Sequence, residues 1–136
     1  MKKVMFVSFS GPDGVGKTSA INLFHKITNY EYVTYDRDIP DQICYAKLAH
    51  RKINNDLVNY MYNNKNQLYV ILNANAEIIK QRMKQRNDSA VPEGTTLEDA
   101  IEYFLTWKNT FYDNVLYIDN SNLNIEQVIK KILEKL

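Results

Sequence analysis

The sequence lacks several features on which whole classes of protein depend. A single cysteine, Cys44, excludes an internal disulfide and indicates a reducing compartment. No apolar stretch approaches the ~20 residues that span a bilayer, so no membrane partner is expected. The formal net charge of +1 argues against a strongly basic nucleic-acid surface. Because His25 and His50 stand apart from other metal-ligating residues, no zinc site is expected.

The length and composition favour one soluble globular domain. The chain has 136 residues, of which 45% are hydrophobic and 24% are charged, and it shows no internal repeat, low-complexity segment or linker. We expect a single domain over residues 1–136, located in the cytoplasm, or in the host cytoplasm if the source is viral. The abundance of Asn, Lys, Ile and Tyr, whose codons are AT-rich, fits a low-GC genome such as that of a virus or phage.

The most informative segment is Gly11–Thr18, which reads G-x-x-x-x-G-K-T and matches the phosphate-binding loop, or P-loop. An apolar strand pattern precedes it and an amphipathic helix pattern follows it, as that motif requires. The glycines bring backbone N–H groups close to phosphate oxygens, and the helix start adds its positive dipole end. Lys17 would reach the transferring phosphates, and the Thr18 hydroxyl would bind Mg²⁺. The residues expected to bind ATP here are Gly11, Pro12, Asp13, Gly14, Val15, Gly16, Lys17, Thr18 and Ser19.

Strand and helix patterns alternate along the chain, which predicts an α/β fold with helices on both faces of a small parallel sheet. We expect a three-layer α/β/α arrangement with about four strands, of the P-loop kinase type. Pro40 suits the first turn of the second helix, Thr96 is the expected cap of the fourth, and residues 87–95 read as a mobile loop. The expected strands are Lys3–Phe9, Glu31–Tyr35, Leu68–Leu72 and Val115–Ile118, and the expected helices are Lys17–Thr28, Asp41–Tyr62, Ala76–Arg86, Thr96–Tyr112 and Ile125–Leu136.

Ligands of such a sheet bind beyond the carboxyl ends of its strands, where Asp36, Arg37 and Asp38 follow the second strand. A carboxylate there can hold Mg²⁺ or take a proton from an attacking hydroxyl, and an arginine can bind an acceptor phosphate. The residues alone leave open which aspartate does this work. The alternative interpretation is an exposed, charged turn.

Two further features are candidates for the site. Arg82 and Arg86 share a helix face and lead into the loop after the helix, where an arginine can stabilise the charge of a moving phosphoryl group. The alternative is a solvated basic helix end, and Lys84 is expected to face solvent.

Asp13 is unusual inside an anion-binding loop. It needs another partner, such as a sugar hydroxyl or a metal-bound water, or else it serves only as a turn residue.

The P-loop with an acid at position 13 resembles that of thymidylate kinases, and Val33–Asp38 is similar to their Asp-Arg-Tyr segment, with Asp38 in place of the Tyr. The resemblance implies that Asp13 contacts the acceptor sugar, that Asp36 works with Mg²⁺ and that Arg37 binds the acceptor phosphate. Asp119–Ser121 resembles the family's adenine-side loop, which implies that Asn120 lies by the donor base. The residue after the loop acid is Gly14, a pattern with which the family tends to supply its catalytic arginine from the lid. That implies a catalytic arginine at Arg82 or Arg86, and a homodimer formed through helices on one side of the sheet.

The chain departs from that family in two respects. The segment between Thr28 and Glu31 has no room for the extra strand and helix of family members, which carry an Arg-Glu-Pro-Gly stretch that helps to bind the acceptor. Asn73 stands where the family usually has Asp. The donor half of the pattern is therefore complete, and the acceptor half is shortened.

Three functions follow as hypotheses. The first is transfer of the ATP γ-phosphate to a (deoxy)nucleoside monophosphate, with Lys17, Arg37, the lid arginines and Mg²⁺ held by Thr18 and Asp36. The second is a kinase of a hydroxyl, on a nucleoside or at a polynucleotide 5′ end, with Asp38 as general base. The third is a P-loop protein without catalytic activity that binds a nucleotide and engages a protein partner.

Overall fold

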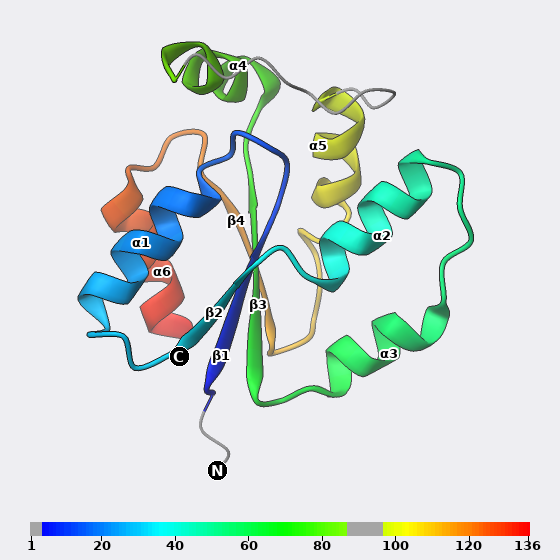
Figure 1. Cartoon of the computed structure of the whole chain (residues 1–136), viewed down its shortest axis with the longest axis horizontal. Helices are drawn as coiled ribbons and strands as arrows, with labels where there is room; N and C mark the ends of the chain where they lie inside the picture. Colours follow the sequence, from blue (N-terminus) through cyan, green and yellow to red (C-terminus); the bar gives the residue numbers. More distant parts are fainter. Residues whose placement is uncertain (1–3, 87–96) are drawn as a thin grey trace.

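The structure is a computed structural model, and residues 4–86 and 97–136 are described. It contains one four-stranded sheet with the order β2-β1-β3-β4, in which all neighbouring strands are parallel. This confirms the expected α/β class and parallel sheet (Figure 1). The elements are β1 (Phe6–Ser10), α1 (Lys17–Ile27), β2 (Val33–Asp36), α2 (Ile39–Leu48), α3 (Asn55–Asn63), β3 (Gln67–Asn73), α4 (Ala76–Gln85), α5 (Leu97–Leu105), β4 (Val115–Asp119) and α6 (Ile125–Lys135).

Helices cover both faces of the sheet and so bury it. Helices α1 and α6 pack together on one face, whereas α2, α3 and α5 lie on the other, and α4 lies beyond the carboxyl edge (Figure 1). All seven residues of β3 are buried, because this strand lies between two others and under helices on both sides. The apolar run that predicts this strand is therefore a consequence of its central position.

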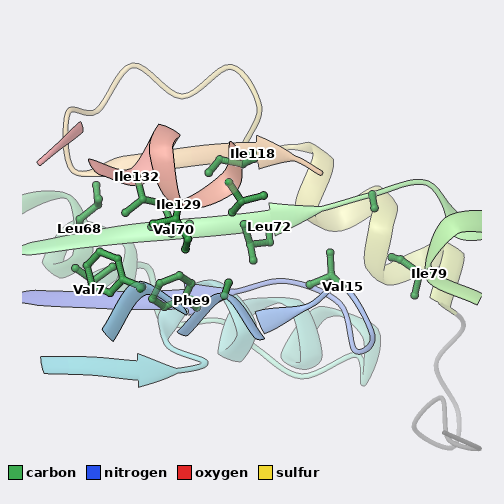
Figure 2. Packing of buried hydrophobic residues seen from close by; sticks show 14 of the residues in the cluster. Val7, Phe9, Val15, Leu68, Val70, Leu72, Ile79, Ile118, Ile129 and Ile132 are labelled. Atoms are coloured by element: carbon green, nitrogen blue, oxygen red, sulfur yellow. The ribbon is translucent and has the colours of Figure 1, made fainter. Parts of the chain in front are cut away.

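The larger hydrophobic cluster lies between the sheet and the α1–α6 face. It joins alternate residues of the central strands to the apolar sides of these helices, and Figure 2 shows Ile129 and Ile132 of α6 beside β3. Val15 belongs to this cluster and is fully buried, so the P-loop is attached to the core by its own side chain (Figure 2). The labelled members of the cluster are Val7, Phe9, Val15, Leu68, Val70, Leu72, Ile79, Ile118, Ile129 and Ile132.

A second hydrophobic cluster fills the opposite face. It contains Ile43 and Cys44 of α2, Met61 of α3 and Phe104 of α5, packed on Tyr69 and Ile71 of β3. Burial raises the pKa of the Cys44 thiol to about 12, which makes the reactive thiolate scarce at neutral pH. The expectation that Cys44 is an inert core residue is thus supported by its surroundings.

The single helix expected over Asp41–Tyr62 is wrong, because the chain forms two helices there. Helix α2 ends at Leu48, and His50 adopts a left-handed conformation with φ of 56° that an α-helix cannot continue through. Helix α3 then begins anew, with the Asn54 side chain accepting a hydrogen bond from the Asp56 N–H at 2.9 Å. Both helices place apolar residues in the same cluster, which explains why their patterns read as one.

The helix expected to reach Tyr112 ends earlier, at Leu105. Beyond it the backbone N–H groups bond to carbonyl oxygens three residues earlier, and the Thr106 hydroxyl donates to the Tyr103 carbonyl oxygen at 2.7 Å, which competes with α-helical bonding. The proposed cap at Thr96 and the loop over 87–95 lie outside the described residues. Pro40 does stand in the first turn of α2, as expected.

Within residues 4–86 and 97–136, no helix has both the length and the apolar character needed to cross a bilayer.

The second cluster provides a test of the fold. Phe104 is fully buried, whereas Phe111 is 97% exposed, although both are phenylalanines of the same region. We expect Phe104→Ala to lower the free energy of unfolding by about 3–5 kcal/mol, because it leaves a cavity under β3. Phe111→Ala is the matched control and should change it by less than about 0.5 kcal/mol. Urea unfolding followed by circular dichroism measures both, and equal losses would contradict the structure.

Candidate functional site

The P-loop between β1 and α1 adopts a backbone conformation that favours glycine at three positions. Gly11, Gly14 and Gly16 have φ of 143°, 82° and 105°. At Gly11 the space is closed as well, since a Cβ would lie 2.1 Å from the Leu72 carbonyl oxygen of β3. The loop therefore lies directly against the central strand, and its glycine pattern has a steric reason.

The loop leaves a set of backbone N–H groups without partners. Among the described residues, the N–H groups of Gly14, Gly16, Lys17 and Thr18 donate no hydrogen bond. Gly16 is the N-cap of α1 and provides no side-chain cap. Successive free N–H groups at a helix start form a site for phosphate oxygens, strengthened by the helix dipole. Phosphate binding at these N–H groups is the prediction that the motif makes.

Lys17 is buried within this loop and is held by its carbonyl oxygens. The Lys17 Nζ donates to the carbonyl oxygens of Gly11 at 2.7 Å and Pro12 at 3.1 Å. Burial lowers the pKa of Lys17, and the charge of nearby Asp41 opposes that effect. The ammonium group is thus held by the carbonyl oxygens at the start of the loop.

Arg82 and Asn120 hold the other end of the loop. Arg82 Nη1 donates to the Asn120 Oδ1 at 2.9 Å and to the Val15 carbonyl oxygen at 3.3 Å, and Nη2 donates to the Asn120 carbonyl oxygen at 3.0 Å. Asn120 Nδ2 donates to the same Val15 oxygen at 2.8 Å. Arg82 therefore acts here as a clamp between the loop, α4 and the end of β4, a role that the sequence did not indicate.

A pocket of about 260 Å³ opens beside this clamp. Its wall combines the P-loop and α1 with apolar residues from the start of α6, and Arg82, Arg86 and Asn120 supply its polar groups. The structure thus brings Asn120 and both expected arginines to one pocket that continues from the P-loop. Arg86 also makes a further interaction and is not a free cation. Lys84 is exposed, as expected.

On the opposite side of the P-loop, Arg37 follows β2 and turns toward Asp13. Its Nη2 lies 2.8 Å from the Asp13 Oδ1, and its guanidinium stands 5.8 Å from the centre of the Tyr45 ring. Arg37 has φ of 77°, a strained value for a residue with a side chain, and its N–H donates to the Phe9 carbonyl oxygen at 2.9 Å. The partner of Asp13 in this structure is therefore Arg37.

Asp38 points away from the P-loop. Its Oδ1 accepts from the Ile39 N–H at 2.8 Å, and its Oδ2 accepts from Gln67 Nε2 at 2.6 Å. Gln67 is the first residue of β3, at the end of that strand remote from the loop. Both carboxylate oxygens of Asp38 are thus used to begin α2 and attach it to the sheet.

Asp41 was not expected at the site, yet it contacts the P-loop directly. Its side chain is buried, its Oδ1 accepts from the Gly11 N–H at 3.2 Å, and its Oδ2 accepts from the Asp38 N–H at 2.9 Å. Burial raises the pKa of Asp41, and the nearby Ser10 side chain and the two backbone hydrogen bonds oppose that rise. The sequence did contain a signal, since an acid three residues after Asp38 completes a capping box.

A second pocket, of about 620 Å³, lies between α2, the segment 49–54 and the start of α3. Ile43, Ile53 and Leu57 form part of an apolar wall, and Arg37, Arg51 and Lys52 add cationic side chains to the lining. Neither Arg51 nor Lys52 has an ion pair within the described part of the chain. The lining contains three cationic side chains, Arg37, Arg51 and Lys52, and two carboxylates, Asp38 and Asp41, so it has a small formal excess of positive charge.

The oxygen donors near the free N–H groups suit Mg²⁺. The Thr18 hydroxyl is exposed at the start of α1, and Asp36 is exposed at the end of β2, opposite Phe9 of β1. Hydroxyl and carboxylate oxygens are ligands that Mg²⁺ takes together with phosphate and water. No group of three or more His, Cys, Asp or Glu within residues 4–86 and 97–136 could hold a metal alone.

Asn73 has a structural position at the end of β3. Its Nδ2 donates to the Ile101 carbonyl oxygen and to the Tyr117 hydroxyl, both at 3.1 Å. It ties α5 and β4 to the central strand and does not point into either pocket.

Comparisons with known proteins give one distant relative in sequence. No family model matches the chain. A protein of Thermococcus gammatolerans described as "Putative adenylate kinase" is 26% identical over 149 aligned positions, which cover 96% of this chain and 84% of that protein. A crystal structure of an uncharacterized protein from Eubacterium ventriosum is 10% identical, covers 96% of each chain and has a TM-score of 0.47.

The Arg82 clamp generates a prediction on nucleotide affinity. Arg82→Gln keeps much of the side-chain length but removes the fork that holds the Val15 and Asn120 oxygens. We expect the dissociation constant for ATP to rise about tenfold or more, since charge-assisted hydrogen bonds contribute about 1.5–3 kcal/mol each. Titration calorimetry measures this, with Lys84→Gln, from the exposed side of the same helix, as control. Equal affinities in both variants would contradict the clamp.

Proposed function

We propose that the protein is an ATP-dependent phosphotransferase that moves the γ-phosphate of ATP to a (deoxy)nucleoside monophosphate. The observation that carries this proposal is the position of the P-loop between two different pockets. One pocket continues from Gly14, Val15 and Gly16, and the other begins at Arg37 and Asp41, which contact the loop from the far side. A phosphotransferase needs such a donor side and acceptor side around one phosphate site.

The donor side has the features that ATP requires. The free N–H groups and Lys17 would surround the β- and γ-phosphates, and the pocket at Arg82 and Asn120 would take the adenine end. Thr18 and Asp36 would hold Mg²⁺, which supplies charge neutralisation between the phosphates when bound. Catalysis would consist of positioning and charge stabilisation, with no covalent enzyme intermediate.

The acceptor side favours a phosphate over a hydroxyl. In the proposed transfer, an oxygen of the acceptor phosphate forms a bond to the γ-phosphorus, the bond from that phosphorus to the β–γ bridging oxygen breaks, and ADP leaves. A phosphate dianion has no proton to lose at this step, whereas a hydroxyl acceptor does and calls for a base. Asp38, the candidate base, has both oxygens occupied by Ile39 and Gln67.

The pocket beside Arg37 matches a nucleotide in size and chemistry. Its volume of about 620 Å³ is in the range of small-molecule sites, its apolar wall suits a base, and its unpaired cations suit a phosphate. The description of the distant relative as an adenylate kinase agrees with a nucleoside monophosphate as acceptor. The finer likeness to thymidylate kinases, the roles of Asp13 and Arg86, and a homodimer remain part of the proposal.

A phosphate-transfer screen tests the function. The protein is incubated with Mg²⁺ and γ-labelled ATP against nucleoside monophosphates, nucleosides and 5′-hydroxyl oligonucleotides. We expect label on one or more monophosphates. Lys17→Ala should abolish it and leave the circular dichroism spectrum unchanged, because it removes the loop's ammonium group from a segment anchored by Val15. Full turnover by Lys17→Ala would contradict the proposal.

The same screen separates the alternatives. Label on a nucleoside or on a 5′ end would replace the proposal by a hydroxyl kinase, and Asp38→Asn would then be the variant to test for loss of the base. Label that stays on ATP across the panel, with ATP still bound, would favour a non-catalytic nucleotide-binding protein with a macromolecular partner.

The unpaired cations of the acceptor pocket provide a second prediction. We expect the double variant Arg51→Gln, Lys52→Gln to raise the KM for the monophosphate about tenfold or more and to leave the KM for ATP unchanged, since both side chains line only the acceptor pocket. Lys65→Gln, at an exposed turn before β3, is the matched control. Steady-state kinetics with each substrate varied in turn measures the effect. An unchanged acceptor KM would remove these residues from the site.

A further inference from the structure

Asp41 is a buried carboxylate that joins two loops of the site. Its side chain belongs to the first turn of α2, and the residue is 2% exposed. One oxygen accepts from the N–H of Gly11, the first residue of the P-loop. The other accepts from the N–H of Asp38, the last residue of the Asp36–Asp38 segment that contains Arg37. A single planar group therefore connects the loop of the donor phosphates to the loop of the proposed acceptor phosphate.

Capping of α2 alone does not account for this arrangement. Asp38 already caps the helix with its own side chain, through its contact with the Ile39 N–H at 2.8 Å. The hydrogen bond from Gly11 adds nothing to the helix, and a buried carboxylate opposes the approach of triphosphate to the same loop. The contact with Gly11 is therefore best explained by what it does for the relative position of the two loops.

The chemistry makes that relative position important. In-line phosphoryl transfer requires the attacking oxygen within about 3–3.5 Å of the phosphorus, and a misplacement of about 1 Å can lower the rate about 10²-fold. The donor side is anchored to the core through Val15, whereas Arg37 stands on a strained, exposed segment. Within the described residues, only Asp41 and the Asp13–Arg37 pair bridge the P-loop and this segment by side-chain hydrogen bonds.

We infer that Asp41 is a positioning residue, which fixes the spacing between the P-loop and the Asp36–Asp38 segment and so aligns the acceptor phosphate with the γ-phosphate. This inference rests on the proposed function. Asp41 borders the proposed acceptor pocket, and the role inferred for it is exerted through the backbone N–H groups of Gly11 and Asp38 that it holds.

The test is the variant Asp41→Asn, which preserves the size and planarity of the side chain. An amide has only one acceptor oxygen, so its NH₂ group must face either the Gly11 N–H or the Asp38 N–H, and one bridge is lost. We expect kcat for transfer to the monophosphate to fall by about 10²-fold, with the KM of either substrate changed less than about threefold. We also expect a larger fraction of ADP to form without phosphorylated product, because water needs no alignment by Arg37.

Two controls separate positioning from stability. Ile132→Val, in the buried part of α6 remote from both loops, should lower Tm and leave kcat and the ratio of ADP to product unchanged. Asp41→Glu keeps the charge and both oxygens but displaces them by a methylene group, so it should also lower kcat. It serves as the test if the Asn variant does not fold by circular dichroism.

Each outcome decides the inference. Full kcat with only a lower Tm in Asp41→Asn, or normal kcat in Asp41→Glu, would show a structural role and overturn it. A rise in KM at unchanged kcat would overturn it as well, because that pattern indicates lost binding. Failure of the wild-type protein to phosphorylate any monophosphate would instead overturn the proposed function, and the inference with it.

Discussion

Side-chain donors bind the carbonyl oxygens of Gly11, Pro12 and Val15 in the P-loop, and the rest of the site depends on these hydrogen bonds. Lys17 holds the oxygens of Gly11 and Pro12 at one end of the loop, and Arg82 with Asn120 holds that of Val15 at the other. With these acceptors satisfied from within, the N–H groups that follow are left for an anion. The left-handed glycines permit this backbone, and the side-chain donors stabilise it. Donors from three separate segments of the chain are needed, so the loop conformation is a property of the whole fold.

The buried charges around the loop partly compensate one another. Burial of Lys17 and of Asp41 disfavours the charged form of each, and their proximity restores part of that loss for both. Arg37 and Asp13 form a more exposed ion pair. Salt would screen this pair, and an incoming phosphate could replace Asp13 as the partner of Arg37. The deeper pair therefore suits a fixed structural role, and the outer pair suits a contact that changes when a substrate binds.

The sequence predicted those parts of the site that a local motif encodes, and it missed those that depend on contacts between distant segments. The P-loop, the parallel α/β sheet and the position of Asp36 and Arg37 at a strand end follow from patterns within a few residues. The clamp by Arg82 requires knowing that α4 lies over Val15 and Asn120, contacts between residues 67 and 38 positions apart. Asp41 was missed because its proximity to Asp38 reads as an ordinary helix start, and only the fold brings Gly11 to its other oxygen.

The break between α2 and α3 is the error with the largest consequence for the site. A helix over residues 41–62 would extend about 33 Å in one direction, at 1.5 Å per residue, and would leave no enclosed space beside Arg37. The left-handed turn at His50 and the new cap at Asn54 fold the second helix back, so that Ile53 and Leu57 face Ile43 across a pocket. The same turn brings Arg51 and Lys52 into the lining. A segment of about thirty residues between β2 and β3 thus supplies the lining of this pocket, and the interruption of its helix gives the pocket its space.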